Sequence, residues 1–210
     1  MGYTSIRQAL EDETVVKKSR FICALRPVQT PEEAADELAK IRKKHYNATH
    51  NCFAMILNED ASYKRASDDG EPQGTAGIPM LEVLQKAGLT NILAVVTRYF
   101  GGTMLGAGGL VRAYSGSVAQ ALGRAQKVVY IPADEYEFTV HYSDYGKLCS
   151  IATEFNAAPE GRFEEVVRVR LVVEKEYGAQ FKERIKQAFL GAEVYTVTGE
   201  CMIMKPAEYK

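Results

Sequence analysis

Short apolar runs and amphipathic segments alternate along the first 130 residues of the chain. β-Branched and aromatic residues gather in segments that predict strands at residues 15–25, 51–58 and 92–96. Residues 62–67 are expected to return as the hairpin partner of the second strand. The second and third runs are apolar without alternation, so we expect both of their faces to be buried in a sheet.

A helical repeat follows the first predicted strand. Thr30 is a typical N-cap residue, Pro31 suits the first helical position, and Glu33 completes a capping box. Behind them, one face carries residues spaced by four, three and four positions: Ala34, Leu38, Ile41 and His45. This spacing predicts a helix that starts at Pro31 and packs that face against a core.

Two further helices are expected in this half of the chain. One covers residues 79–87 and is followed by Gly88, a residue type that often ends helices. The other begins after a glycine-rich loop at residues 106–109 and runs to about Ala125. Several residues of this helix are small, which allows it to approach a sheet closely.

The second half follows a different order after a connector at residues 131–133. The pattern reads strand, helix, strand, strand, helix, strand, over residues 136–142, 144–155, 161–165, 166–174, 179–190 and 192–204. Apolar and polar residues alternate regularly in the fourth of these segments, so we expect one face of its sheet to be exposed to solvent. The order βαββαβ is typical of a ferredoxin-like domain. We therefore predict an α+β chain with two domains, 1–133 and 134–210, of which the second is a binding or interaction module.

Composition narrows the class of protein. The chain is 46% hydrophobic and 25% charged, as globular domains are. No apolar run approaches the roughly 20 residues that cross a bilayer, and the N-terminus lacks the apolar stretch of a secretory signal. No CxxC pair occurs among Cys23, Cys52, Cys149 and Cys201, which excludes a zinc ribbon. We expect a cytoplasmic protein with reduced thiols, no metal and no cofactor.

The formal net charge of −1 is the sum of a slightly basic first half and a slightly acidic second half. Residues 1–133 hold 16 Lys and Arg against 13 Asp and Glu, whereas residues 134–210 hold 10 against 14. Any contact with nucleic acid must therefore come from a local patch. Basic residues gather in two groups, Lys17, Lys18 and Arg20, and Lys40, Arg42, Lys43 and Lys44. The second group closes the first helix, as the helix dipole prefers, so a solvated helix end explains it as well as a phosphate contact does.

An acidic turn at residues 67–77 is the first candidate for chemistry. It combines three carboxylates, those of Asp68, Asp69 and Glu71, with three glycines. Clustered carboxylates can hold Mg²⁺ or raise the pKa of one of their number. A polar turn between a strand and a helix is the alternative interpretation.

A glycine-bearing turn is the second candidate. A buried strand ends in Arg98, and the turn and the helix after it supply the remaining candidates: Gly101, Gly102, Gly108, Gly109, Arg112 and Ser115. Free backbone N–H groups, a helix dipole and arginines can together grip a phosphate or a carboxylate. The spacing fits neither a P-loop nor a dinucleotide fingerprint, so tight turns with close helix packing remain an alternative. His50, which opens the second strand, is the best candidate for a functional imidazole.

Long stretches around both turns resemble the YigZ/IMPACT family. The carrying blocks are DDGEPQGTAG at residues 68–77 and RYFGGTMLGAGGLVRAY at residues 98–114. Residues 16–27 and 48–58 are also similar to this family, and the second half is more loosely similar to the small C-terminal domain of its bacterial members. The resemblance spans nearly the whole chain.

The resemblance implies an N-terminal domain with the fold of the second domain of small-subunit ribosomal protein five and a ferredoxin-like C-terminal domain. It also implies a non-enzymatic, translation-associated regulator that binds RNA or the ribosome, since the eukaryotic members are translational regulators. The alternative is a phosphate-ligand-binding enzyme or sensor, in which Arg98, Arg112 and Ser115 hold the anion and Asp69 or Glu71 acts as base or places a metal. A protein-binding adaptor is a third interpretation that the sequence does not separate from the first.

Overall fold

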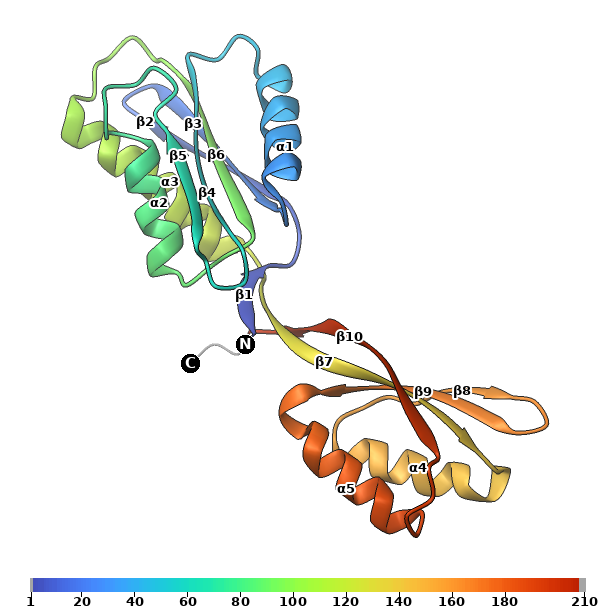
Figure 1. Cartoon of the computed structure of the whole chain (residues 1–210). Helices are drawn as coiled ribbons and strands as arrows, with labels where there is room; N and C mark the ends of the chain where they lie inside the picture. The colour runs from blue at the N-terminus through green and yellow to red at the C-terminus, as the bar shows by residue number, and fades with distance from the viewer. Residues whose placement is uncertain (1, 208–210) are drawn as a thin grey trace. The chain divides into compact units, whose positions relative to one another are not determined.

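The computed structural model describes residues 2–207. The chain divides into two compact units, one made mainly by residues 2–129 and one by residues 130–205, and each has its own hydrophobic core. Both units combine helices with a sheet, so the predicted α+β fold class is confirmed (Figure 1). Among the residues that the structure describes, no helix is both long and apolar enough to cross a membrane.

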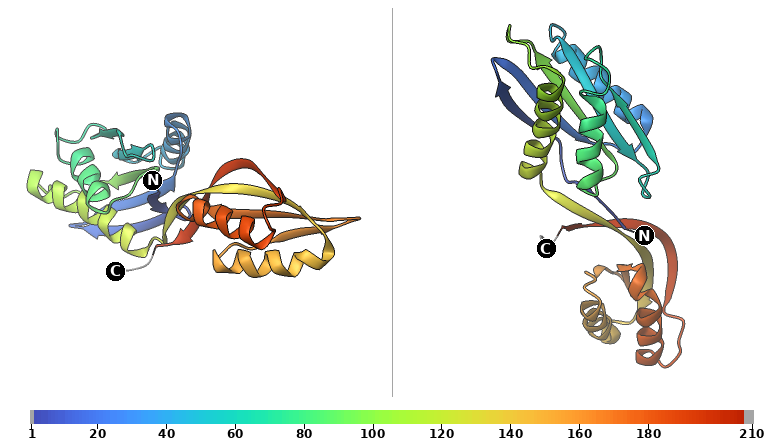
Figure 2. Two further views of the ribbon diagram at one scale, coloured as in Figure 1. Left: turned by 60° about the horizontal axis from the view of Figure 1, so that its bottom comes forward. Right: turned by 90° about the vertical axis from the view of Figure 1, so that its left-hand side faces the viewer.

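The first unit is a three-layer structure around a five-stranded antiparallel sheet. The sheet order is β2-β3-β6-β4-β5, built from β2 (Leu10–Val16), β3 (Ser19–Pro27), β4 (His50–Leu57), β5 (Tyr63–Ser67) and β6 (Ile92–Tyr99). One face is covered by α1 (Pro31–Lys44) and the other by α2 (Gly77–Lys86) and α3 (Ala107–Arg124) (Figures 1 and 2). A further strand, β1 (Tyr3–Ile6), pairs with β7 (Lys127–Val140).

The continuous apolar runs of β4 and β6 follow from this layering. In β6, Ile92 and Val96 face the core beneath α2 and α3, whereas Leu93 and Val95 face the core beneath α1. Side chains alternate between the faces of a strand, so a strand covered on both sides needs apolar residues at every position.

The first helix begins where the capping residues predict. The Thr30 hydroxyl accepts a hydrogen bond from the backbone N–H of Glu33 at 3.2 Å. The Glu33 carboxylate accepts from the N–H of Gln29 rather than from that of the cap residue, so the reciprocal bond of the box lies one position earlier. His45 ends the helix partly buried, with its Nδ1 2.9 Å from the Tyr99 hydroxyl.

The first predicted strand is two strands of a tight hairpin. Lys17 and Lys18 form the turn with φ values of 46° and 68°, which is the left-handed backbone of a two-residue hairpin. The sequence pattern missed this turn because neither residue is Gly, Asn or Asp, the types that favour this conformation.

The second unit has the ferredoxin-like topology. Its elements are β7 (Lys127–Val140), α4 (Tyr142–Glu154), β8 (Glu160–Phe163), β9 (Val167–Glu174), a 3-10 turn (Lys175–Tyr177), α5 (Gly178–Ala188) and β10 (Tyr195–Pro206). The strand order within this unit is β10-β7-β9-β8, with α4 and α5 packed on one face. The predicted connector at residues 131–133 lies inside β7 instead. Pro132 lies one residue before the pairing of β7 with β9 begins at Ala133, so the ladder with β9 needs no N–H group from it.

The end of β6 packs directly on the β2–β3 hairpin. A Cβ atom at Gly101 would lie 2.0 Å from the backbone carbon of Lys18. The Ser19 hydroxyl accepts a hydrogen bond from the Gly101 N–H at 3.1 Å, which holds the two backbones at this spacing. Only glycine fits this approach.

We therefore expect Gly101→Ala to lower the free energy of unfolding by about 2 kcal/mol or more, because a backbone must move to admit the methyl group. Urea unfolding would measure the change. Gly116→Ala is the matched control: nothing lies within 4 Å of its Cβ position in α3, so this variant should gain about 0.5–1 kcal/mol. Equal stability of the two variants would contradict the close packing.

Candidate functional site

The two candidate turns meet at one end of the first unit. Arg98, near the end of β6, lies opposite His50 on β4 and opposite Phe21 on β3. The acidic turn joins β5 to α2, and the glycine-bearing turn joins β6 to α3. The polar residues of both turns therefore gather where β4 begins and β6 ends.

A buried ion pair joins the two turns. Arg98 Nη1 donates to Glu71 Oε1 at 2.6 Å, with the residues only 6% and 8% exposed. The Tyr114 hydroxyl on α3 donates to the same oxygen at 2.7 Å. The rings of Phe21 and Phe100 each lie 5.5 Å from the Arg98 guanidinium, a distance typical of cation–π contacts. Strand β6 and helix α3 thus each supply a donor to one carboxylate of the acidic turn.

One donor of this arginine has no partner. Among the described residues, the buried side-chain polar atoms without a hydrogen bond are Arg98 Nε and Asn91 Oδ1. A buried unpaired donor costs about 1–3 kcal/mol, and more when the group is charged. Such a cost at a polar centre is a common feature of ligand sites.

Burial makes Tyr114 and Cys52 neutral donors. Desolvation is the main cause of the raised pKa of Tyr114, and Cys52 and Glu71 add to it. Desolvation also raises the pKa of Cys52 to about 12, and its thiol donates to the carbonyl of Asp68 at 2.9 Å. A thiol in this state is not a nucleophile at neutral pH.

The first carboxylate of the acidic turn, that of Asp68, is hydrogen-bonded to backbone N–H groups that follow it in the chain. The Asp68 carboxylate accepts three N–H donors, from Gly74 at 2.8 Å, Ala76 at 3.0 Å and Gly77 at 2.8 Å. Burial alone would raise the pKa of Asp68, but these three donors outweigh it and lower the pKa below its usual value. This carboxylate therefore serves as the cap at the start of α2.

The Asp69 carboxylate is also hydrogen-bonded within the protein. Its Oδ2 accepts from the Asn51 N–H at 2.7 Å, and its Oδ1 accepts from Arg42 at 2.8 Å. Within residues 2–207, no three His, Cys, Asp or Glu side chains are grouped as metal ligands would be. The carboxylates of this turn are thus directed at the protein.

His50 lies beside the ion pair. Its Nδ1 is 2.8 Å from the backbone carbonyl of Asp69, and its Nε2 is 3.9 Å from Glu71 Oε2. The carbonyl can only accept, so Nδ1 carries the proton of this hydrogen bond. Nε2 is left facing the second oxygen of Glu71.

A pocket of about 390 Å³ opens over this centre. Its floor includes His50, Glu71 and Arg98, and its walls are largely apolar: Pro72, Phe100, Met104, Leu105 and Leu110. Phe100 is 49% exposed and Met104 is 86% exposed. Large apolar side chains at the rim of a polar-floored pocket are typical of a binding site.

Basic groups lie next to this pocket. Lys17, Arg112 and Gly109 line a smaller hollow of about 190 Å³, and Leu105 lines both hollows. Helix α3 starts there without a side-chain cap or an acidic residue in its first turn. Its N-terminal N–H groups and dipole therefore add positive potential to that of the two cations.

Most of the predicted site residues lie at this end of the unit, but some of them do not line the pocket. His50, Glu71 and Arg98 share its floor, while Gly101 and Gly102 belong to the turn beside it. The Ser115 hydroxyl donates to the Val111 carbonyl at 2.7 Å, inside its own helix. The joint contact of Ser115 and Arg112 with one anion stays a prediction. Gly108 and Gly109, expected in a loop, lie in the first turn of α3.

The remaining predicted cations differ in their partners. Arg20 makes two hydrogen bonds of 2.9 Å to Glu13, so it is largely neutralised. Lys17 and Lys18 form the hairpin tip and have no carboxylate within 4.0 Å among the described residues. Tyr114 and Ser19 are the partners that sequence reasoning missed. Nothing local in the sequence signals the long-range bonds of these two residues to Glu71 and Arg98.

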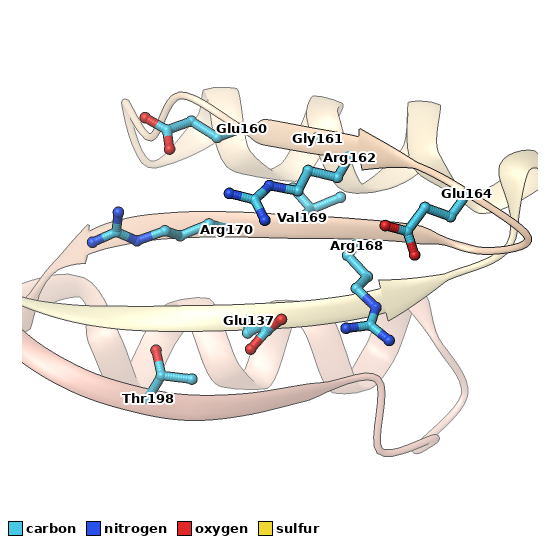
Figure 3. Close-up of a pocket in the computed structure, with 9 residues that line it drawn as sticks. All are labelled: Glu137, Glu160, Gly161, Arg162, Glu164, Arg168, Val169, Arg170 and Thr198. Atoms are coloured by element: carbon cyan, nitrogen blue, oxygen red, sulfur yellow. The ribbon is translucent and has the colours of Figure 1, made fainter.

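A second hollow, of about 490 Å³, lies on the open sheet face of the other unit (Figure 3). Arginines on β8 and β9 share it with Glu137, Glu160 and Glu164. Arg170 pairs with Glu135 at 2.8 Å and lies in register with glutamates on both neighbouring strands. Charges of both signs alternate on this face, so it offers no uniform surface to a phosphate backbone.

The fold and the site define a two-domain α+β protein whose first domain carries a buried Arg–Glu centre beneath an open pocket. Residues 17–122 match the family model of the Impact N-terminal domain, a segment that holds the whole site. The chain belongs to the IMPACT family.

Individual proteins of this family are similar in sequence to the chain. The IMPACT family member YvyE of Bacillus subtilis is 56% identical over 121 residues, 58% of this chain and 56% of that protein. An IMPACT family member of Haemophilus influenzae is 43% identical over 148 residues, 70% of each chain. A crystal structure described as that of a hypothetical protein has 29% identity and a TM-score of 0.63 over 100% of this chain and 98% of that one. The aligned part thus spans little more than half of the Bacillus protein.

The buried pair generates a stability prediction. Arg98→Ala should lower the free energy of unfolding by about 3–5 kcal/mol, because it leaves the Glu71 carboxylate buried without its counter-charge. The exposed Arg112→Ala is the control and should change stability by no more than about 0.5 kcal/mol. Chemical unfolding of both variants would test this. A similar, small loss for both would show that Arg98 is not structurally required.

The Asp68 cap generates a pH prediction. Its pKa is lowered in the folded state, so its stabilisation is complete above the unfolded value of about 3.9 and is lost as the pH falls through the lowered folded value. Asp68→Asn should therefore be less stable than the wild type at neutral pH, and the difference should shrink below about pH 4. Unfolding free energies measured from pH 7 to pH 2 would check it. A difference that is independent of pH would contradict the role of the charge.

Proposed function

We propose that this protein is a non-enzymatic, translation-associated regulator of the cytoplasm that binds RNA or the ribosome through the basic end of its first unit. Membership of the IMPACT family supports the translational role. The main observation in support of this binding surface is that cations without a salt-bridge partner among the described residues lie beside the start of α3, which has no side-chain cap. These cations are Lys17, Lys18 and Arg112.

The charge pattern identifies which basic residues remain available. Several cations expected from the sequence are already paired: Arg20 with Glu13, Lys40 with Glu37, Arg42 with Asp69, and Lys44 with Glu11. Exposed pairs of this kind are weak, yet they cancel much of the local field. Lys17, Lys18 and Arg112 have no such partner within the described part of the chain, so they supply the charge for phosphate contacts.

The enzymatic alternative has less support. It needs Asp69 or Glu71 as a base or metal ligand and Ser115 on the anion. Both carboxylates are held by arginines, and the Ser115 hydroxyl is bonded within α3. The features that remain, namely cations, helix N–H groups and an apolar pocket, bind ligands without requiring a reaction.

The proposal predicts a salt-dependent association. The protein should co-sediment with ribosomes, or bind single-stranded RNA in fluorescence anisotropy, and the affinity should fall steeply with salt because phosphate contacts release counterions. The double variant Lys17→Glu/Lys18→Glu should weaken binding at least tenfold and flatten the salt dependence by about one to two contacts.

Lys64→Glu is the matched control. Lys64 is exposed on β5 and pairs in register with Ile56, far along the strand from the site, so its reversal should leave the affinity within about twofold. Absence of binding to ribosomes and to RNA at low salt would remove the proposed function. Equal loss in both variants would move the contact away from the hairpin.

A further inference from the structure

We propose that the pocket above Glu71 receives one unpaired nucleobase that carries an exocyclic amino group. This inference rests on the RNA-binding function proposed above and names the part of the RNA that the pocket takes. We call the pocket lined by His50, Glu71, Arg98, Phe100 and Met104 the base pocket.

Two hydrogen-bond acceptors face each other on the floor of the base pocket. His50 Nδ1 donates to the Asp69 carbonyl, so in this tautomer Nε2 is the ring nitrogen that can accept a hydrogen bond. Glu71 Oε1 already receives Arg98 and Tyr114, whereas Oε2 lies 3.9 Å from that Nε2. At this distance no hydrogen bond joins them, and neither atom has another donor among the described residues.

An amino group satisfies this arrangement. An –NH₂ group carries two donors, and a nitrogen placed between acceptors 3.9 Å apart can reach both at ordinary hydrogen-bond length. A carbonyl oxygen in the same place would meet two acceptors and be repelled. The floor therefore distinguishes bases with an amino group from uracil, which has none.

Charge favours a neutral donor over a cation. Arg98 lies 2.6 Å from Glu71 and neutralises its carboxylate, so a lysine or arginine from a protein partner would meet an arginine already in place. A base amino group brings hydrogen bonds without a net charge.

The walls fit a flat apolar ring. Phe100 presents a half-exposed aromatic side chain, with Met104 and Leu105 beside it. Bases of single-stranded RNA are commonly bound by stacking on such aromatic rings. Leu105 also lines the hollow that holds Lys17 and Arg112, so the phosphate of the bound nucleotide has cations next to it.

The test compares two oligonucleotides that differ only at this group. Cytosine has an amino group at ring position 4 where uracil has an oxygen, and their rings are otherwise matched in size. Fluorescence anisotropy should show about tenfold tighter binding of labelled oligo(C) than of labelled oligo(U), both of ten nucleotides. His50→Ala should reduce this preference to twofold or less with little change for oligo(U).

Two variants separate the parts of the pocket. Phe100→Ala, at an exposed position, should weaken both oligonucleotides at least fivefold while the preference between them persists. His45→Ala replaces a histidine outside the pocket and should leave affinity and preference unchanged. Thermal unfolding of each variant confirms that it is folded.

The outcomes distinguish this inference from the proposed function. Equal binding of oligo(C) and oligo(U), with loss in Lys17→Glu/Lys18→Glu, would overturn the base pocket and keep RNA binding. A preference for oligo(C) that survives both His50→Ala and Phe100→Ala would place base recognition elsewhere and overturn the inference as well. Binding of neither oligonucleotide would remove both proposals.

Discussion

The buried contact between Arg98 and Glu71 is the constraint on which the site depends. Two charges at 6% and 8% exposure are stable only with good geometry and further hydrogen bonds, and Tyr114 and Ser19 supply these from α3 and β3. The acidic turn, the last strand of the sheet and the following helix are thereby fixed to one point. Exposed groups such as Phe100 and Arg112 can then be flexible side chains on a rigid base.

Much of the fold follows from local pattern. The apolar runs of β4 and β6 and the capped start of α1 are found where the sequence predicts them, because burial on both faces and helix capping leave local signals. The sequence pattern did not predict the hairpin turn at Lys17 and Lys18, and it wrongly predicted a connector where β7 runs through Pro132. The hairpin turn is local, but it places two lysines in a backbone conformation that usually favours Gly, Asn or Asp. The strand through Pro132 instead pairs with β9, which is distant in sequence and overrides the local propensity.

The site was predictable in part, for the same reason. His50, Glu71 and Arg98 stand out by residue type, and family resemblance drew attention to both turns. The role of Asp68 as a cap and the engagement of Tyr114 depend on distances across the fold that no spacing encodes. The Ser115 hydroxyl bonds to the preceding turn of its own helix, a contact that a spacing of three residues from Arg112 does not reveal.

Ser19 follows the two-residue turn immediately, and its hydroxyl accepts from both Arg98 and Gly101. An insertion of a single residue between Lys17 and Ser19 would rotate this side chain to the other surface of the sheet. The position of Ser19 therefore restricts the length of that turn, which should be invariant among related sequences.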